Sequence, residues 1–245
     1  KENKIDQKDN NEVVICMGGK STRMQNLKKG YKAFINVLNL PMFKFVANFF
    51  PHKKKSIILT KDLYRIKQSI FDKIDPIFLQ RSTNSQIETI KESKSNLQKK
   101  KNFFLISCDA FGFFNKSLFN KLSKKKETSV IIFVFKPSLV QKYSSNSHTY
   151  VSFNKKNEIV SINIKIKKKK NDLGLAGFFW FKDGLIFKKV SKIRNNNKNE
   201  ILIDHFIKYI LKKKTMIKAV KLENYIHLGT INEYKEFTFW YEKFK

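Results

Sequence analysis

A glycine-rich turn near the start of the sequence has the residue types of a phosphate-binding loop. Residues 13–16 (VVIC) have the length and the β-branched content of a buried strand. The strand pattern ends at Gly18 and Gly19, where no Cβ atom keeps a ligand away from the backbone. Lys20 and Arg23 follow, so backbone N–H groups and two cations are available to hold phosphate oxygens. A tight strand-to-helix turn with solvated charges would use the same residues, so the turn alone leaves both interpretations open.

Two common phosphate loops do not fit this turn. A Walker A loop needs a glycine five residues before Gly19, and Val14 stands there. The dinucleotide fingerprint G-x-G-x-x-G needs a further glycine close by, and the next one after Gly19 is Gly30. The turn therefore belongs to neither class.

A second candidate is a carboxylate at the end of a buried strand. Residues 102–108 are nearly all apolar, which predicts a central strand covered on both faces, and this strand leads directly into Asp109. A carboxylate at the carboxyl end of a strand, facing a phosphate loop, is an ordinary way to hold a magnesium ion against a nucleotide. The alternative is an aspartate that caps the following turn, residues 110–114.

The elements that must position these residues alternate between strand and helix in the first half of the chain. Strands are predicted at residues 13–16, 56–60, 76–79 and 102–108, with helices at 41–50, 61–71 and 87–97. This alternation predicts an α/β fold with a doubly wound, mostly parallel sheet flanked by helices. Ligands of such sheets bind at the carboxyl ends of strands, so the glycine turn and Asp109 are predicted to lie together.

The second half predicts a different kind of sheet. Apolar runs at residues 130–135, 150–153, 159–164, 174–181 and 216–222 suggest antiparallel or mixed strands. A helix is predicted at residues 200–211, and residues 225–230 lead into a terminal helix. We expect one domain over residues 12–245, with residues 1–11 as a polar tail or a linker from a longer polypeptide.

The charge of the chain raises nucleic acid as a partner, but its make-up argues against a specific one. The 245 residues carry 51 basic and 20 acidic side chains, a formal net charge of +31. Arginine is the preferred residue for bidentate phosphate and base contacts. Only four of the basic residues are arginines: Arg23, Arg65, Arg81 and Arg194. The lysines are spread along the chain, so we predict no specific nucleic-acid partner.

Cysteine usage and hydropathy point to a reducing compartment. Cys16 and Cys108 lie inside apolar runs and read as buried free thiols. No apolar run approaches the ~18 residues of a membrane helix, and no signal peptide is visible. The cytoplasm is the expected location.

The opening of the chain resembles a known family. GGKSTRM at residues 18–24, Lys32, and NLPMFKFVANFF at residues 39–50 resemble the start of the sugar-phosphate nucleotidyltransferases, also called nucleotide-sugar pyrophosphorylases. Tyr31 replaces the proline that often precedes the family's lysine. The GGKSTRM string also resembles the molybdopterin guanylyltransferases, so this stretch alone does not name the substrate.

Two later motifs resemble the nucleotide and metal sites of the same family. TNSQIET at residues 83–89 resembles its base-recognition loop, in which Gln86 matches the glutamine that reads the nucleobase and Ser85 replaces the usual glycine. Alternatively, Ser85 caps the N-terminus of a helix, and this role is compatible with base recognition by the same loop. SCDAFGFF at residues 107–114 resembles the apolar strand whose terminal aspartate, here Asp109, binds magnesium.

Two further motifs resemble the sugar site and the closing signature. LAGFFWF at residues 175–181 resembles a strand whose backbone, at Gly177, faces the sugar. An E-K pair that binds the sugar and its phosphate precedes it in the family, and Ile166 and Lys167 stand at those positions here. HLGTINEY at residues 227–234 resembles the closing D-x-G-T-P-x-[DE]-[LY] pattern. His227 stands where many members have a second magnesium aspartate.

The resemblance implies a Rossmann-like nucleotidyltransferase fold and a magnesium-dependent reaction. A nucleoside triphosphate would donate its nucleotidyl group to a sugar phosphate or similar phosphorylated metabolite, with release of pyrophosphate, in the synthesis of surface-glycan precursors. The resemblance places Met17, Gly18, Gly19, Lys20 and Gln86 around the nucleotide. It places Arg23, Lys32 and Asp109 at the reacting phosphates, Lys167 and Gly177 at the sugar phosphate, and Asp109 and His227 at Mg²⁺.

Other interpretations remain open at this point. A non-catalytic nucleotide-sugar-binding module would carry the same loops, and a molybdopterin guanylyltransferase-like enzyme would share the opening motif. A glycosyltransferase of related architecture is disfavoured because no D-x-D pair surrounds Asp109. The sequence does not fix the base, the acceptor, the oligomeric state, or a fusion or association with another biosynthetic domain.

Overall fold

The protein is described by a computed structural model over residues 11–19, 31–51, 53–66, 68–137, 148–167, 169–193 and 201–244. Most of the expected N-terminal tail, together with Lys20 and Arg23, lies outside these residues. None of the helices within them has the length and apolar character needed to cross a membrane.

Four parallel strands form the first half of the sheet, as the sequence predicts. They are β1 (Glu12–Cys16), β4 (Lys55–Thr60), β5 (Asp75–Leu79) and β6 (Lys101–Ser107), in the order β5-β4-β1-β6. Their connections contain the helices α1 (Met42–Ala47), α2 (Lys61–Ile66), α3 (Gln86–Glu92) and α4 (Lys94–Gln98). Because these four strands run in the same direction, their carboxyl ends lie at one edge of the sheet.

The second half adds strands of mixed direction, giving ten strands in one sheet over the described residues. Strand β11 (Leu173–Asp183) runs antiparallel to β6 and to β8 (Val130–Phe135), and β12 (Ile217–His227) runs parallel to β8. An antiparallel pair, β9 (Tyr150–Phe153) and β10 (Ile159–Asn163), joins β11 through β9. The predicted mixed sheet is therefore confirmed.

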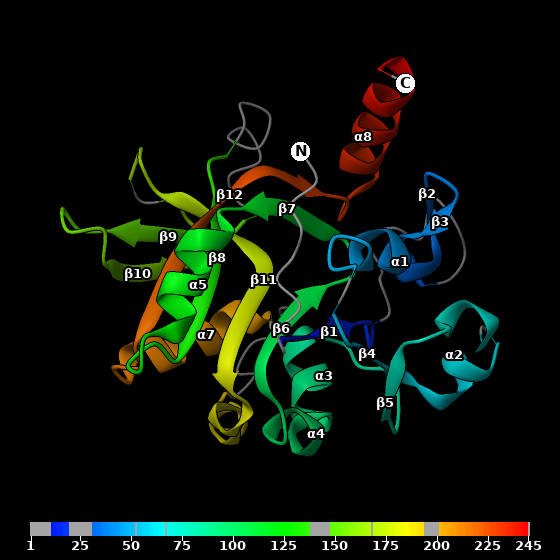
Figure 1. Ribbon diagram of the computed structural model, residues 1–245, viewed down its shortest axis with the longest axis horizontal. Helices are drawn as coiled ribbons and strands as arrows, with labels where there is room; N and C mark the ends of the chain where they lie inside the picture. Colours follow the sequence, from blue (N-terminus) through cyan, green and yellow to red (C-terminus); the bar gives the residue numbers. More distant parts are fainter. Residues whose placement is uncertain are drawn as a thin grey trace.

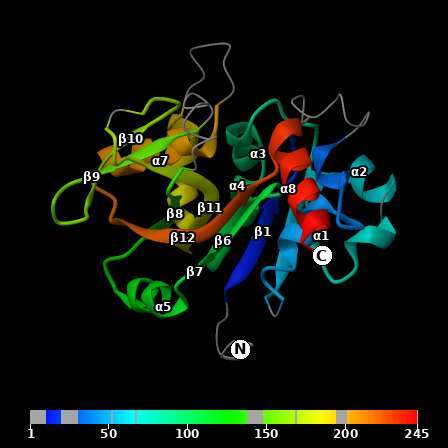
Figure 2. The same ribbon diagram turned by 90° about the horizontal axis from the view of Figure 1, so that it is seen from above.

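Apolar side chains cover both faces of this sheet. In β1, Val13 and Ile15 belong to one core and Val14 to the other, which is the alternation expected of a central strand. One core contains buried residues of α1, α2 and α5 (Lys116–Lys124), and the other contains those of α3, α4, η5 (Gly184–Lys192) and α7 (Ile203–Lys212). Figure 2 shows α5 on one side of the sheet and α3, α4 and α7 on the opposite side.

The structure differs from the predicted elements mainly after Asp109. Residues 110–114, a turn in the alternative interpretation of Asp109, form strand β7 (Ala110–Phe114), which pairs antiparallel with β12 and leads into the unpredicted helix α5. The predicted helix at 61–71 is divided into α2 and η3 (Gln68–Phe71), and that at 87–97 is divided at Ser93. Ser93 Oγ donates to the carbonyl of Thr89 (2.8 Å), which competes with the helical hydrogen-bond ladder there.

Shorter elements complete the chain around α1 and at the C-terminus. The predicted helix at 41–50 is reduced to α1, because a hairpin of β2 (Asn36–Val37) and β3 (Leu40–Pro41) precedes it, and η2 (Lys32–Phe34) starts this region. The last helix, α8 (Ile231–Lys243), follows β12 and stands beside α1 at one end of the sheet (Figures 1 and 2).

Candidate active site

A cleft of about 440 Å³ lies at the carboxyl ends of β1 and β6. Residues from distant parts of the sequence line it: the predicted nucleotide residues Met17, Gly18, Gly19 and Gln86, the predicted phosphate and substrate residues Lys32, Asp109 and Gly177, and the predicted metal residue His227. The glycine turn and Asp109 therefore share one cavity, as their positions at strand ends predict. Lys20 and Arg23 lie outside the described residues.

The two glycines of the turn have different structural roles. A Cβ atom at Gly18 would lie 2.5 Å from Leu79 Cδ1 and 2.8 Å from Thr89 Oγ1, so only glycine fits between them. Thr83 fixes the same residue, because its N–H and its hydroxyl each donate to the Gly18 carbonyl (3.0 Å). At Gly19 no described atom lies within 4 Å of an ideal Cβ. Gly18 is thus required by packing, and Gly19 is the position where bare backbone borders the open space.

The loop before α3 places Gln86 in the cleft. Ser85 caps this helix, as expected, by accepting a hydrogen bond from Glu88 N–H (3.2 Å), and Glu88 accepts in turn from Asn84 N–H (2.8 Å). Gln86 Oε1 accepts from the backbone N–H of Ile203 (3.2 Å), at the start of α7. Because Oε1 already accepts this bond, the side-chain NH₂ of Gln86 is the group that can donate to a ligand in the cleft.

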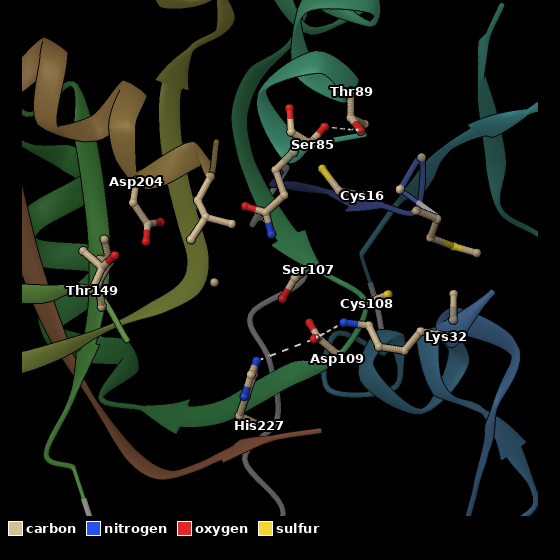
Figure 3. Close-up of a pocket in the computed structure, with 18 of the residues that line it drawn as sticks. Cys16, Lys32, Ser85, Thr89, Ser107, Cys108, Asp109, Thr149, Asp204 and His227 are labelled. Carbon is tan, nitrogen blue, oxygen red and sulfur yellow. Dashed lines mark hydrogen bonds and ion pairs between the residues drawn. The ribbon is translucent and has the colours of Figure 1, made fainter. Parts of the chain in front are cut away.

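Three side chains of alternating charge, Lys32, Asp109 and His227, lie next to one another in the cleft (Figure 3). Lys32 Nζ forms an ion pair with Asp109 Oδ2, and His227 Nε2 lies 3.5 Å from the same oxygen. His227 Nδ1 lies 3.0 Å from both carboxylate oxygens of Glu233. Asp109 is only 5 % exposed, so these partners hold a buried carboxylate.

Burial and these partners shift the pKa values of Asp109 and His227 in opposing directions. Burial raises the pKa of Asp109, but the Lys32 charge and the contacts with His227 outweigh it and hold this pKa well below its usual range. Burial lowers the pKa of His227, but hydrogen bonds to Asp109 and Glu233 outweigh that effect and raise it to about 9. At neutral pH the site therefore contains an ionised aspartate between two cations.

The structure places His227, a predicted metal ligand, between two carboxylates, and its role toward a metal stays a prediction. Both of its ring nitrogens face carboxylates, and an imidazolium has no free lone pair to offer a metal. Within the described residues, no group of three or more His, Cys, Asp or Glu side chains is arranged to hold a metal ion. Asp109 remains as a single buried, ionised carboxylate.

Of the two residues predicted at the sugar phosphate, one lines the cleft and the other does not. Lys167 is not among the described residues that line the cleft; its Nζ lies 5.9 Å from the centre of the Tyr150 ring, in the loop after β10. Gly177 lines the cleft as predicted, and a Cβ there would lie 2.7 Å from Ser107 Oγ. The structure therefore places the Lys167 ammonium group beside Tyr150 and not on the lining of the cleft, and its phosphate contact stays a prediction.

The two cysteines both line the cleft but are not nucleophiles. Cys108 is buried and Cys16 is half-buried, so the expectation of full burial holds only for Cys108. Burial raises the pKa of each thiol to about 12, and their mutual repulsion adds to this effect for Cys16. Both stay protonated thiols at neutral pH.

Several cleft residues carried no signal in the sequence. His148, Thr149 and Asp204 line the cleft, and all three are buried. Glu233 lies in the closing signature, but nothing there indicated a contact with His227. Asp204 belongs to the first turn of an amphipathic helix, where an acidic residue is ordinary.

Comparisons with known proteins identify the fold. No protein-family model matches this sequence, and no curated protein matches it. An inositol-1-phosphate CTP transferase from T. maritima superposes with a TM-score of 0.73 at 13% identity, over 93% of each chain. A UDP-glucose pyrophosphorylase complexed with UDP-glucose gives a TM-score of 0.72 at 15% identity, over 96% of this chain and 99% of that one. A nucleoside-diphosphate-sugar pyrophosphorylase from Vibrio cholerae gives 0.69 at 16% identity, over 92% and 99%. The chain therefore has the Rossmann-like fold of sugar-phosphate nucleotidyltransferases of known structure.

Proposed function

We propose that this chain transfers a nucleotidyl group from a nucleoside triphosphate to a sugar phosphate or a similarly phosphorylated polyol and releases pyrophosphate. The observation that carries the proposal is the position of Asp109. Its ionised carboxylate lies beside Lys32 in the cleft that also contains the glycine turn and Gln86. The shared fold supports the same reaction class. A supply of activated precursors for surface glycans would be the corresponding cellular role.

The reaction requires alignment and charge neutralisation rather than covalent participation by the protein. A phosphate oxygen of the acceptor attacks the α-phosphorus in line, the bond to the oxygen bridging the α- and β-phosphates breaks, and pyrophosphate leaves with that electron pair. Lys32 would neutralise the attacked phosphate, and Asp109, which His227 holds in place, would fix the position of its ammonium group. Lys20 and Arg23 would hold the triphosphate.

The residues present fit a magnesium ion with one protein ligand. Mg²⁺ is commonly held by one or two carboxylates together with substrate phosphates and water, and Asp109 offers one ionised carboxylate in the cleft. When bound there, the ion would neutralise charge on the triphosphate oxygens. His227 would not bind it, because both ring nitrogens already face carboxylates.

Gln86 would select the base. Its NH₂ group donates, so it suits an acceptor atom on the edge of a nucleobase. The Ile203 backbone holds the amide in this orientation, because a flipped amide would place two N–H donors against each other.

The test is a pyrophosphate-release screen of four nucleoside triphosphates against a panel of phosphorylated acceptors, with and without magnesium. We expect release with at least one pair and loss of release in Lys32→Ala. Absence of release with every pair, in a protein that still binds a triphosphate, would refute the enzyme proposal.

A second candidate function is favoured by one observation, the histidine at position 227. A non-catalytic nucleotide-sugar-binding module on this fold would not need a second metal carboxylate. It predicts nucleotide binding without pyrophosphate release in the same screen.

A further inference from the structure

Two buried polar side chains lie on the wall of the cleft opposite Lys32 (Figure 3). Thr149 stands directly before β9 and is 3 % exposed, and Asp204 lies in the first turn of α7 and is 7 % exposed. Both line the cleft, and the phosphate chemistry described above uses neither of them. Thr149 lies beside β11, the strand that contains Gly177, because the N–H of Leu175 donates to the Thr149 carbonyl.

Thr149 carries a hydroxyl group that lacks a partner among the described residues. The backbone is fixed there, because the N–H of Leu175 donates to the Thr149 carbonyl (2.7 Å). Its Oγ1 is buried without a hydrogen bond to any described group. Burying an unpaired hydroxyl is destabilising, and valine would fill the same space without that penalty. A ligand in the cleft would provide the missing partner.

Asp204 complements this hydroxyl with a group that only accepts hydrogen bonds. A carboxylate near a helix start is stabilised by the helix dipole, but an exposed carboxylate serves that purpose equally well. Here the side chain is buried and lines the cleft. A carboxylate has about four acceptor positions, so it can accept from a ligand in addition to its protein contacts. It therefore attracts donors and repels phosphate oxygens.

Asp204 and Thr149 together favour a hydroxyl group of the ligand over an ammonium group. A hydroxyl group can donate to Asp204 and accept from Thr149 at the same time. An ammonium group can only donate, and would leave the Thr149 proton unpaired. Lys167, the cation expected near the acceptor, does not line the cleft.

We propose that Asp204 and Thr149 form the subsite that binds neighbouring hydroxyl groups of the acceptor, an inference that rests on the proposed nucleotidyl transfer. The acceptor is then a phosphorylated polyol, a sugar or cyclitol phosphate, rather than a phosphorylated amino alcohol. Its phosphate points to Lys32, and its hydroxyls point to the opposite wall.

The test compares matched variants in the pyrophosphate-release assay. Thr149→Val is paired with Thr128→Val, because Thr128 is also buried (0 % exposed) with an unpartnered hydroxyl, but lies outside the cleft lining. Asp204→Asn is paired with Asp183→Asn, which alters the cap of η5 away from the cleft. We expect the KM for the acceptor to rise ~3- to 10-fold in Thr149→Val and ~10- to 100-fold in Asp204→Asn. The KM for the nucleoside triphosphate should stay within about 2-fold, well below the effect of one lost hydrogen bond. Both control variants should retain both constants.

The acceptor panel contains glucose 1-phosphate, myo-inositol 1-phosphate, phosphocholine and phosphoethanolamine. Release with only the last two would uphold nucleotidyl transfer and overturn the polyol subsite. Release with a polyol phosphate, but with equal acceptor KM in Thr149→Val and Thr128→Val, would overturn it as well.

If no pair releases pyrophosphate, the proposed function fails and the subsite is tested by calorimetric binding of the two polyol phosphates. Weaker binding in Asp204→Asn and Thr149→Val than in their controls would support the subsite on its own. Equal binding would overturn it.

Discussion

His227 Nε2 lies 3.5 Å from Asp109 Oδ2, so a residue that the sequence resemblance predicts at the magnesium ion carries a positive charge. Together with Lys32 it encloses Asp109 between two cations. The arrangement leaves one carboxylate, rather than two, to interact with a metal ion. Its consequences can be measured.

The charge on His227 predicts a loss of stability at alkaline pH. Its pKa is about 9 in the folded protein and 6.5 in the unfolded chain. A raised folded pKa stabilises the fold fully below pH ~6.5, and this contribution is lost as the pH rises through about 9. Urea unfolding should therefore show a decrease on the order of 3 kcal/mol across that window in the wild type. His227→Gln should not show it.

His205→Gln is the control for this measurement. Burial lowers the pKa of His205, so its removal should leave the decrease between pH 6.5 and 9 in place. Parallel stability curves for wild type and His227→Gln would contradict the ion-pair assignment.

Removal of the Lys32 charge should slow the reaction without unfolding the protein. In Lys32→Ala, Asp109 still faces His227, so the buried carboxylate keeps one partner. Loss of a positioned charge at the attacked phosphate lowers kcat by about 10²-fold or more. Lys54→Ala is the matched control, because Lys54 pairs with Asp75 on the surface, where the side chains are 68 % and 62 % exposed. Turnover close to wild type in Lys32→Ala would end this assignment.

The two glycines of the turn should respond differently to alanine. Gly18→Ala forces a methyl group against Leu79 and Thr89, and overpacking of this kind costs about 1–3 kcal/mol. No atom of the described residues obstructs a methyl group at Gly19, so the free energy of unfolding of Gly19→Ala should be nearly unchanged. If the bare backbone at Gly19 lies against the triphosphate, the same variant should raise the KM for that substrate. Equal stability losses in the two variants would show that the packing difference does not exist.

Gln86 should determine which nucleoside triphosphate is used. Gln86→Ala removes the amide that the Ile203 backbone orients, so discrimination between bases should fall by ~10-fold, the value of one hydrogen bond in a buried site. The measurement is kcat/KM for each of four triphosphates. Gln68→Ala, in the exposed part of η3, should leave all four values unchanged. An unaltered preference in Gln86→Ala would place base recognition elsewhere.

Much of the fold follows from local patterns in the sequence. The apolar run of β6 predicts a central strand because its residues are covered on both faces, and Asp109 at its end is predicted to meet the glycine turn for topological reasons. Strand β7 was not predictable in the same way. It lies at the sheet edge, and its pairing with β12 depends on residues more than a hundred positions away.

The residues of the candidate site were predictable only where they belong to one local sequence motif. Ser85 and Gln86 lie on one local loop, so their sequence spacing already fixes their geometry. Thr149 and Asp204 come to the same cleft only through the tertiary fold, and each is an ordinary residue in its local sequence. The charge of His227 likewise depends on Glu233 and Asp109, which approach it from a separate helix and strand end.

Glu233 also closes the cap of α8, accepting from the N–H (3.1 Å) and the hydroxyl (2.8 Å) of Thr230 while it accepts from His227. One carboxylate thus ties the first turn of the terminal helix to the imidazolium in the cleft. A change of charge there, such as the loss of the His227 proton, would therefore act on a carboxylate that also holds the first turn of the C-terminal helix. The thirteen-residue helix α8 is connected to the candidate site in this way, although none of its side chains is buried in the core.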